Sequence, residues 1–469
     1  MLKYIHGKSY IYILLAGCLV AICSCRTLPV QNRHTVQSRL PETFISLGTQ
    51  ITGSRIYWKH SFPSDSLKAD VLTLLEKNYQ IAAARARMKK AMAEYGIADS
   101  LTLPSMNASA GFDRSRIKEI TDSAPTTRNT FDIGTVLQWE PDIWGQLEAG
   151  KKAAALMIQE KKAMVDQTAL DLQFSLVQTW IKYHGAFQLE KVLKAQQKTN
   201  AEILKLINLR LAQGDGNALD ILQQQGRIAY ISRALPEVIS KKEQYAHAYA
   251  VLLGKLPDHG IRPRDEWPVL KKIPAIPSPR ELLADRSDLK AVFWALQAAD
   301  QNVAMAIAER LPRISIGLNH TLSGRAVADF GKGRALSFVS GILMPVFDAG
   351  RLKANVSAKK AQALENLALL EQSVLNAVQE VEDALVKENA LSDEHQLLKK
   401  EVSIAMETVD RSKFQYLNGR QSFLSVLVTL EKLQNLQKNE IQLKQALLIN
   451  RGYLLKALSA EWSDPHENS

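Results

Sequence analysis

Two pairs of segments alternate between apolar and polar positions with a period of two. In one of them Met106, Ala108, Ala110 and Phe112 fall on one side, and small or polar residues lie between them. This alternation is typical of β-strands that have one apolar face. We expect strands at about residues 103–114, 130–140, 312–322 and 335–346. Each is about ten residues long, which suits a tilted strand that crosses a bilayer.

Long helices are expected after each strand pair. Proline is absent from residues 142–235 and 346–464, and proline costs about 3 kcal/mol inside a helix. A helix over residues 145–213 would extend for roughly 100 Å. The sparse glycines, Gly214 and Gly419 among them, are interpreted as turns between antiparallel helices. A shorter helical stretch precedes each strand pair, at residues 67–98 and 279–310.

The chain contains an internal repeat with a constant offset. Gly214 matches Gly419 and Leu219 matches Leu424, each pair 205 residues apart. A period of this length indicates a duplicated, domain-sized unit. The expected organisation is a signal peptide at 1–24, a tether at 25–63, a first repeat at 64–256, a proline-rich connector at 257–279, a second repeat at 280–462 and a tail at 463–469.

The N-terminus has the pattern of a secretory signal. Lys3 and Lys8 precede an apolar run from Ile11 to Ile22, which is too short to span a bilayer. Cys25 follows small Ser24, as in a bacterial lipoprotein signal, and we expect Cys25 to carry the lipid. Cys18 is the alternative acceptor, and an ordinary cleaved signal with incidental cysteines stays open. Because no cysteine follows Cys25, we expect no disulfide in the mature chain.

Composition favours an ordered protein without enzymatic chemistry. The formal net charge is +11, but Lys and Arg are scattered, so we expect no nucleic-acid partner. The nine histidines show no metal-ligand spacing, and Glu382 and Asp383 are adjacent on an expected helix, so they do not face one another as an acid–base pair would. We therefore expect no catalytic residue, cofactor or bound metal.

Four strands in one chain are too few to close a membrane barrel, which starts at about eight strands. Open strand edges leave backbone groups unsatisfied in lipid. The strands are therefore expected to close with copies of the same chain.

Several motifs stand in a fixed order along the mature chain. They are Cys25 with Pro29, Trp139–Gly145, Gly214–Leu222, Pro345–Arg351, Val381–Leu385, and Lys456–Leu458 followed by Trp462. Together they resemble the outer membrane efflux protein family, the TolC-like channels, and the lipidated OprM/NodT-type subgroup fits best. The resemblance covers nearly all of the mature chain.

The resemblance implies an α+β membrane protein in the outer membrane. Three copies would form a twelve-stranded barrel, continued by a long periplasmic α-helical barrel. A homotrimer of this kind would be the passive exit duct of a tripartite pump for drugs or other toxic solutes. Its partners would be a periplasmic adaptor and an inner-membrane transporter, with the RND type favoured. A type I protein secretion duct and a lipid-anchored coiled-coil scaffold without a pore stay open as alternatives.

The helix turns are the expected periplasmic mouth. The resemblance makes five residues candidates for gating or adaptor contact: Gly214, Leu219, Asp220, Gly419 and Leu424. The plainer interpretation of Leu219 and Leu424 is packing within the helix hairpins. Where some relatives have an acidic residue in the second hairpin, this chain has Val428.

Overall fold

The computed structural model describes residues 44, 57–117, 125–257, 260, 262–264, 267–268, 276, 278–279, 285–460 and 462. Cys18, Cys25 and the expected signal peptide lie outside the described residues, as do most of the tether, much of the connector and the 463–469 tail.

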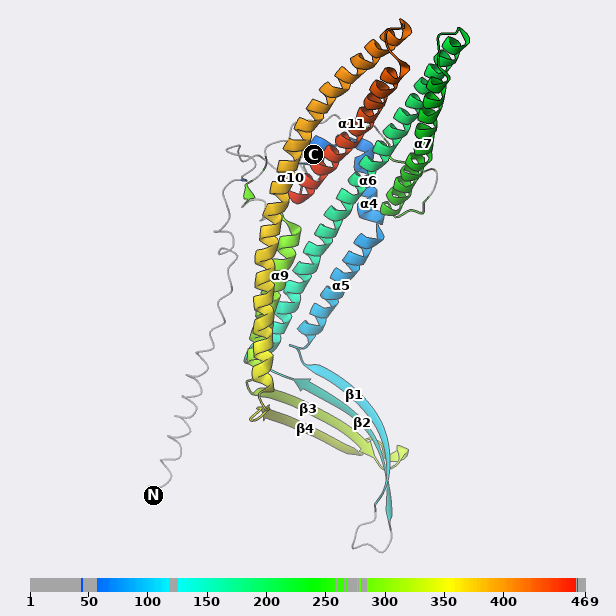
Figure 1. Cartoon of the computed structure of the whole chain (residues 1–469). Coiled ribbons are helices and arrows are strands. Elements are labelled where there is room, and N and C mark those ends of the chain that lie inside the picture. The colour runs from blue at the N-terminus through cyan, green and yellow to red at the C-terminus, as the bar shows by residue number, and fades with distance from the viewer. Residues whose placement is uncertain are drawn as a thin grey trace. The chain divides into compact units, whose positions relative to one another are not determined.

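The first repeat follows the short helix α3 (Trp58–Ser61) (Figure 1). It consists of α4 (Asp65–Lys77), α5 (Tyr79–Ser100), β1 (Ser105–Ile117), β2 (Thr126–Trp139), α6 (Gln146–Ala212) and α7 (Ala218–Leu252). The second repeat consists of α9 (Ser287–Ala308), β3 (Arg313–Gly324), the 3-10 turn η2 (Val327–Asp329), β4 (Gly333–Leu343), α10 (Arg351–Leu417) and α11 (Phe423–Ala457).

The long helices reproduce the sequence offset. Both α6 and α10 have 67 residues, both α7 and α11 have 35, and α10 and α11 each begin 205 positions after their counterparts. The repeat seen in the sequence is therefore a repeat in structure.

The first helical stretch is interrupted, which the sequence did not indicate. Asn78 separates α4 from α5, and its side-chain Oδ1 accepts hydrogen bonds from the backbone N–H groups of Gln80, at 2.8 Å, and Ile81, at 3.4 Å. Asn78 Nδ2 also donates to the carbonyl of Leu252 at 2.9 Å. Asn78 caps α5 because its side-chain oxygen accepts from backbone N–H groups that lack an intrahelical partner at the start of that helix.

All four strands form one antiparallel sheet in the order β1-β2-β3-β4. The first hairpin pairs further than expected, up to Ile117 with Thr126, because backbone pairing continues past the apolar residues into polar sequence. β4 ends earlier than expected, at Leu343. β1 and β4 are the two edges of the sheet within the described chain.

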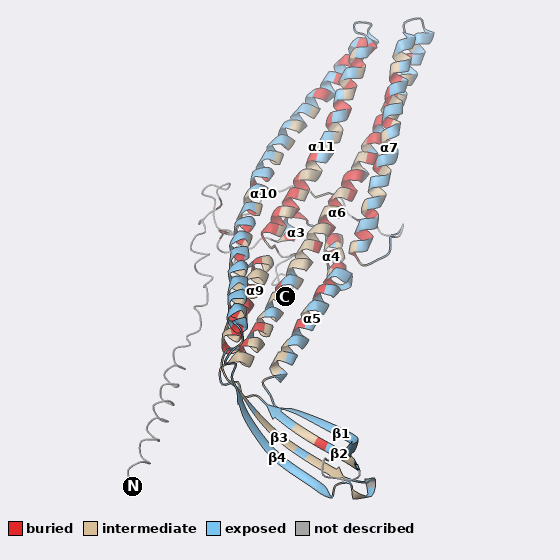
Figure 2. Cartoon of the chain, turned by 60° about the horizontal axis from the view of Figure 1, so that its bottom comes forward, coloured by how far each residue is buried: buried red, intermediate tan, exposed pale blue. Residues whose placement is uncertain are grey.

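The chain divides into two compact units, and each draws on both repeats. One unit contains residues 88–161 and 291–371 and holds the whole sheet. The other contains residues 162–290 and 372–469, together with residues 40–87. In Figure 2 the edge strands β1 and β4 are almost entirely exposed, the inner strands β2 and β3 contain many residues of intermediate exposure, and buried residues follow stripes along the helices.

The largest apolar core lies in the second unit. It includes Phe44, Trp58, Leu176, Trp180 and Leu448, all of them at most 2% exposed. Trp58 Nε1 donates to the carbonyl of Ala460 at 2.9 Å, and its ring stacks on Trp462 at 6.2 Å. These contacts join the beginning of the described chain to its end. Among the described residues, none of the helices combines the length and apolarity needed to cross a membrane.

Candidate functional site

The sheet has two chemically different faces. The register aligns Leu137, Leu318 and Phe338 in one row, and Phe112 contacts Phe131 on the same face, with ring centroids 4.7 Å apart. Many of these apolar side chains are exposed; Phe338 is 68% exposed. On the opposite face small and polar residues dominate, as in the row formed by Gly134 and Thr321 with its neighbours. An exposed apolar face of this kind fits lipid, and the polar face fits a water-filled lumen.

The two helix turns have the same backbone geometry. Gly214 and Gly419 follow the last turns of α6 and α10 with positive φ angles of 85° and 70°. In each turn two backbone N–H groups bond back to the carbonyls of the helix end: Gly214 to Leu211 and Asp215 to Arg210 in the first turn, Gly419 to Tyr416 and Arg420 to Gln415 in the second. This is a Schellman motif, and it favours glycine at the left-handed position. The sequence interpretation of these glycines as turn residues agrees with the structure.

Leu219 and Leu424 lie in the first turns of α7 and α11. They are 55% and 53% exposed, so packing within the hairpins does not account for them. Asn217 caps α7 by accepting from the Leu219 N–H at 3.0 Å. The two leucines are thus equivalent apolar positions presented beside the two turns.

Asp220 belongs to a group that the sequence did not bring together. Arg210 Nη1 donates to the Tyr416 carbonyl at 2.6 Å, and the Arg210 guanidinium lies 4.6 Å from the Tyr416 ring centroid. Burial raises the pKa of the Asp220 carboxyl, and the charge of Arg210 opposes that rise in part. Around these groups Ile207, Tyr416, Phe423 and Val426 form a small apolar core. The end of α6 is therefore bonded to the end of α10.

Arg210 and Tyr416 do not occupy equivalent positions of the two repeats. The counterparts are Gln415 for Arg210 and Leu211 for Tyr416. A comparison of the repeats for positions where charge or size differs could have singled them out.

A buried polar layer joins α6, α7 and α11 further from the turns. Asn200 and Gln224 are both 0% exposed, and Gln224 Nε2 donates to the Asn200 carbonyl at 2.8 Å. Arg227 donates to Gln434 Oε1 at 2.7 Å and to Glu431 at 3.0 Å. Buried polar groups need such partners because an unpaired one costs about 1–3 kcal/mol. The layer specifies how these three helices pack.

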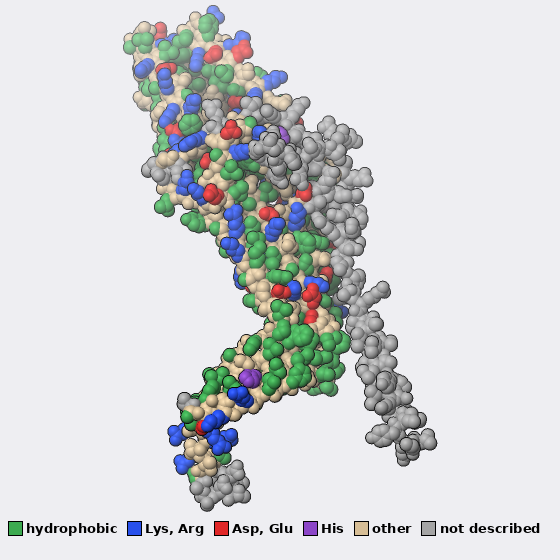
Figure 3. All heavy atoms as spheres, turned by 180° about the vertical axis from the view of Figure 1, so that it is seen from behind, with side chains coloured by type: hydrophobic (Ala, Val, Ile, Leu, Met, Phe, Trp, Pro, Cys, Tyr) green, Lys and Arg blue, Asp and Glu red, His purple; other side chains and the backbone are tan. Residues whose placement is uncertain are grey.

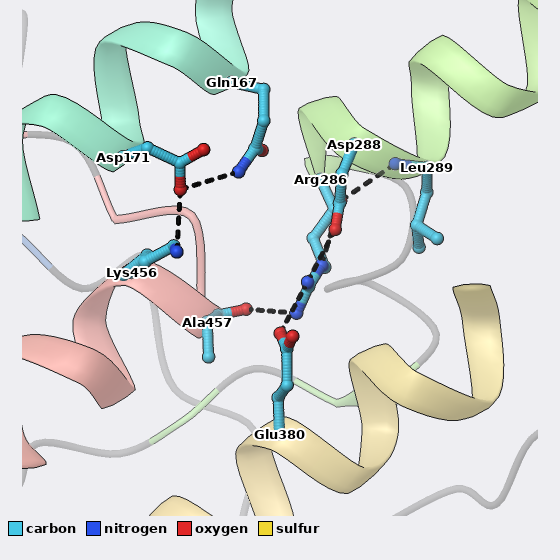
Figure 4. A network of polar contacts seen from close by, with 8 residues as sticks. All are labelled: Gln167, Asp171, Arg286, Asp288, Leu289, Glu380, Lys456 and Ala457. Carbon is cyan, nitrogen blue, oxygen red and sulfur yellow. Dashed lines mark hydrogen bonds and ion pairs between the residues drawn. The ribbon is translucent and has the colours of Figure 1, made fainter. Parts of the chain in front are cut away.

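A second polar network ties the start of α9 to α10 and α11 (Figure 4). The Arg286 side chain, 7% exposed, bonds Asp288 and Glu380 at 2.7 Å each and the Ala457 carbonyl at 3.0 Å. Burial would lower the pKa of Arg286, but Asp288 and Glu380 outweigh it and raise that pKa. Nearby, Lys456 pairs with Asp171 at 2.7 Å. These contacts hold the helices together and present no reactive group.

Within the described part of the chain, no group of three or more His, Cys, Asp or Glu side chains is placed to hold a metal ion.

Comparisons with known proteins agree with this architecture. The model of the outer membrane efflux protein family matches residues 72–254 and 278–460, once for each repeat. The chain is 26% identical over 419 residues to the pyoverdine export outer membrane protein OpmQ of Pseudomonas putida, covering 86% of this chain and 88% of that protein. It is 27% identical over 414 residues to nodulation protein T of Rhizobium leguminosarum bv. viciae, covering 86% and 84%.

Among solved structures, the fold is similar to that of the outer-membrane channel OprN. The TM-score is 0.84 at 23% identity, with 90% of this chain and 98% of that chain covered. The expected fold class, that of the trimeric TolC-like channels with a duplicated repeat and four strands per chain, is confirmed. Family members are ducts that work with a periplasmic adaptor and an inner-membrane pump. The chain belongs to the outer membrane efflux protein family and is an outer-membrane efflux channel.

Proposed function

We propose that three copies of this chain form a lipid-anchored, passive exit duct without enzymatic activity. The observation that carries the proposal is the four-stranded sheet with an apolar face and, among the described residues, two unpaired edges, β1 and β4. Lipid cannot satisfy the backbone groups of an open edge, so β1 of one copy pairs with β4 of the next. Three copies then close a twelve-stranded barrel.

Cross-linking tests this closure, because no cysteine follows Cys25 in the sequence. In each variant one cysteine replaces Ser109 on β1, and a second replaces one residue of β4. The position of the second cysteine changes from variant to variant, from Ser337 to Gly341. A disulfide should form between subunits at one or two β4 positions and give trimers on a denaturing gel. The same β4 series combined with a cysteine at Gly134, on the inner strand β2, is the control. If no position of the first series links subunits, the proposed closure is wrong.

We assign the two helix turns to the closed periplasmic mouth. Gly214 and Gly419 make the turns possible, and Asp220 lies with Arg210 and Tyr416 where the ends of α6 and α10 are joined. Separating those ends would widen the mouth. Arg210 is therefore the first residue to change.

Arg210→Ala should increase the conductance of channels in planar bilayers, because it removes both the bond to the Tyr416 carbonyl and the cation–π contact. Arg411→Ala is the matched control, since Arg411 is an exposed arginine of α10 whose bonds go to Glu407 on the same helix. The control should conduct like the wild type. Equal conductance of the wild type, Arg210→Ala and Arg411→Ala would show that Arg210 does not help to keep the mouth closed.

Leu219 and Leu424 are proposed to contact the adaptor. They are exposed, apolar and equivalent in the two repeats, which favours burial by a partner. A photoreactive amino acid at either position should capture a periplasmic adaptor in cells, and an RND-type transporter should accompany the captured complex. The control is Leu397 of α10, which is 69% exposed and far along the helix from the turn. Capture at all three positions alike would contradict a specific contact.

Lipid attachment at Cys25 is compatible with the length of the tether. The nineteen residues from Cys25 to the buried Phe44 can extend for about 65 Å. An extended tether of this length can hold a lipid anchor well away from the core around Phe44.

Mass spectrometry of the mature N-terminal peptide tests the anchor. Cys25→Ala should abolish acylation, and Cys18→Ala should leave it intact. If acylation persists in Cys25→Ala and is lost in Cys18→Ala, then Cys18 carries the lipid.

A further inference from the structure

The two edge strands carry arginines at their loop ends, on the apolar face. In β1, Arg114 and Arg116 continue the alternation of Phe112. In β4, Arg334 continues that of Leu336 and Phe338. All three arginines are exposed. Figure 3 shows Lys and Arg side chains gathered at this end of the sheet, beyond its hydrophobic side chains.

The position of these arginines corresponds to lipid headgroups. On the apolar face of β2, the residues from Trp139 to Phe131 span about 27 Å along the strand. With a tilt of about 40°, this is about 20 Å across the bilayer, close to the apolar band of about 25 Å in outer-membrane barrels. The contact between Phe112 and Phe131 marks the outer limit of the band. Arg114 is the next residue of β1 on that face.

The acidic residues described around this end do not neutralise the arginines. Asp113 and Asp132 fall on the opposite face by register, and Asp329 pairs with Lys332. Arg334 Nε donates to the Gly331 carbonyl at 3.2 Å. Glu119 and Asp122 of the intervening loop lie outside the described residues.

We propose that Arg114 and Arg116, together with the partner subunit's Arg334, bind phosphate groups of anionic lipid in the outward-facing leaflet. The proposal rests on the trimeric closure above, which brings β1 beside β4 of the next copy. Guanidinium groups gathered at one junction repel one another unless an anion lies between them, and arginine binds phosphate through two parallel hydrogen bonds. The three subunit junctions would thus each hold a phosphorylated lipid.

Native mass spectrometry of the full-length trimer, titrated with lipid A in mild detergent, tests the proposal. Arg114→Gln/Arg116→Gln should weaken lipid A binding about tenfold or more, since each arginine near an anionic surface contributes about 1 kcal/mol. Arg334→Gln should weaken it severalfold. The control is Arg128→Gln, since Arg128 pairs with Ser115 on the opposite face of the same hairpin. Because Arg128 lies on the face opposite to the proposed lipid site, this control should bind lipid A within about twofold of the wild type although it loses one charge.

Three results would overturn the lipid site: a wild-type trimer that retains no lipid A, equal binding by wild type and the double variant, or an equal loss in Arg128→Gln. The spectrum reports the trimer mass directly, so loss of assembly is separated from loss of lipid. If the double variant does not assemble, Arg116→Gln and Arg334→Gln decide the question singly. Absence of the trimer in the wild type would instead contradict the proposed closure.

Discussion

Residues with left-handed backbone angles recur at the same points of the two repeats. The residues of the first repeat with positive φ are Gly145, Gly214 and Gly254, and those 205 positions later are Gly350, Gly419 and Ser459. Only the last pair differs in residue type. Ser459 has a φ of 50° just after α11, where Gly254 has 71° just after α7. A left-handed conformation costs an L-residue about 1–2 kcal/mol.

Ser459→Gly should therefore stabilise the protein. The expected gain is about 0.5–1 kcal/mol, because relief of the left-handed strain exceeds the entropy cost of the added glycine. Gly254→Ala is the opposite test and should destabilise, since a Cβ there would lie 2.5 Å from the Lys77 carbonyl oxygen. Denaturant midpoints measure both changes. An unchanged or lower midpoint for Ser459→Gly would show that its conformation is not strained.

Asp220 should make the first helix turn sensitive to pH. Burial raises the pKa of its carboxyl above the ordinary value of 3.8, although Arg210 opposes the rise. The folded state thus favours the protonated acid, so its stabilising contribution is full below the ordinary pKa and is lost as the pH rises through the raised pKa. Asp220→Asn should remove this dependence. Hydrogen exchange around the turn, corrected for intrinsic rates, should show greater protection at acidic than at neutral pH in the wild type alone.

The strands show how a single residue step separates two environments. Leu318 lies on the apolar face between Leu137 and Phe338, and Asn319 lies on the other face between Val136 and Ser337. Leu318→Arg should cost about 2–4 kcal/mol and reduce the assembled protein in the membrane. Asn319→Arg should be tolerated, because its charge would face the lumen. Similar losses in both variants would mean that the two faces are not lipid and lumen.

At the scale of elements, hydrophobic periodicity was sufficient to predict the strands, and the absence of proline was sufficient to predict the long helices. Neither pattern could predict hydrogen bonds that individual side chains make to the backbone. The break between α4 and α5 depends on Asn78 bonding to Gln80, Ile81 and Leu252, and only the last of these is distant in sequence. A lone asparagine in a helical pattern carries no strong signal, so one continuous helical stretch was expected. The polar ends of the first hairpin were likewise expected to be loop, because alternation reports side-chain environment and not backbone pairing.

In the whole molecule, membrane insertion and assembly should be a single event. A lone copy would leave the edges of β1 and β4 open in lipid, which is strongly unfavourable. Heating should therefore remove the trimer band and the infrared signal of the strands together. Inserted monomers that keep their β-structure would contradict this coupling.

The constant offset predicted the duplicated architecture, because every long helix keeps its length and spacing. The bonds that join the repeats could not be predicted in the same way. The bond of Arg210 to Tyr416 and that of Arg227 to Gln434 each connect positions that are not equivalent in the two repeats. The repeat pattern in the sequence therefore does not predict these bonds. For the candidate site, the turns were therefore recognisable and their polar connections were not.

The matching hairpins also have a consequence for symmetry. Each copy contributes one turn at Gly214 and one at Gly419, so a closed trimer would present six similar turns of two alternating kinds. The backbone geometry would be nearly sixfold, but the chemistry would be threefold, because Asp220 has Ser425 as its counterpart. A ring of six identical partner chains would then meet two kinds of contact, and its members would bind with two different affinities.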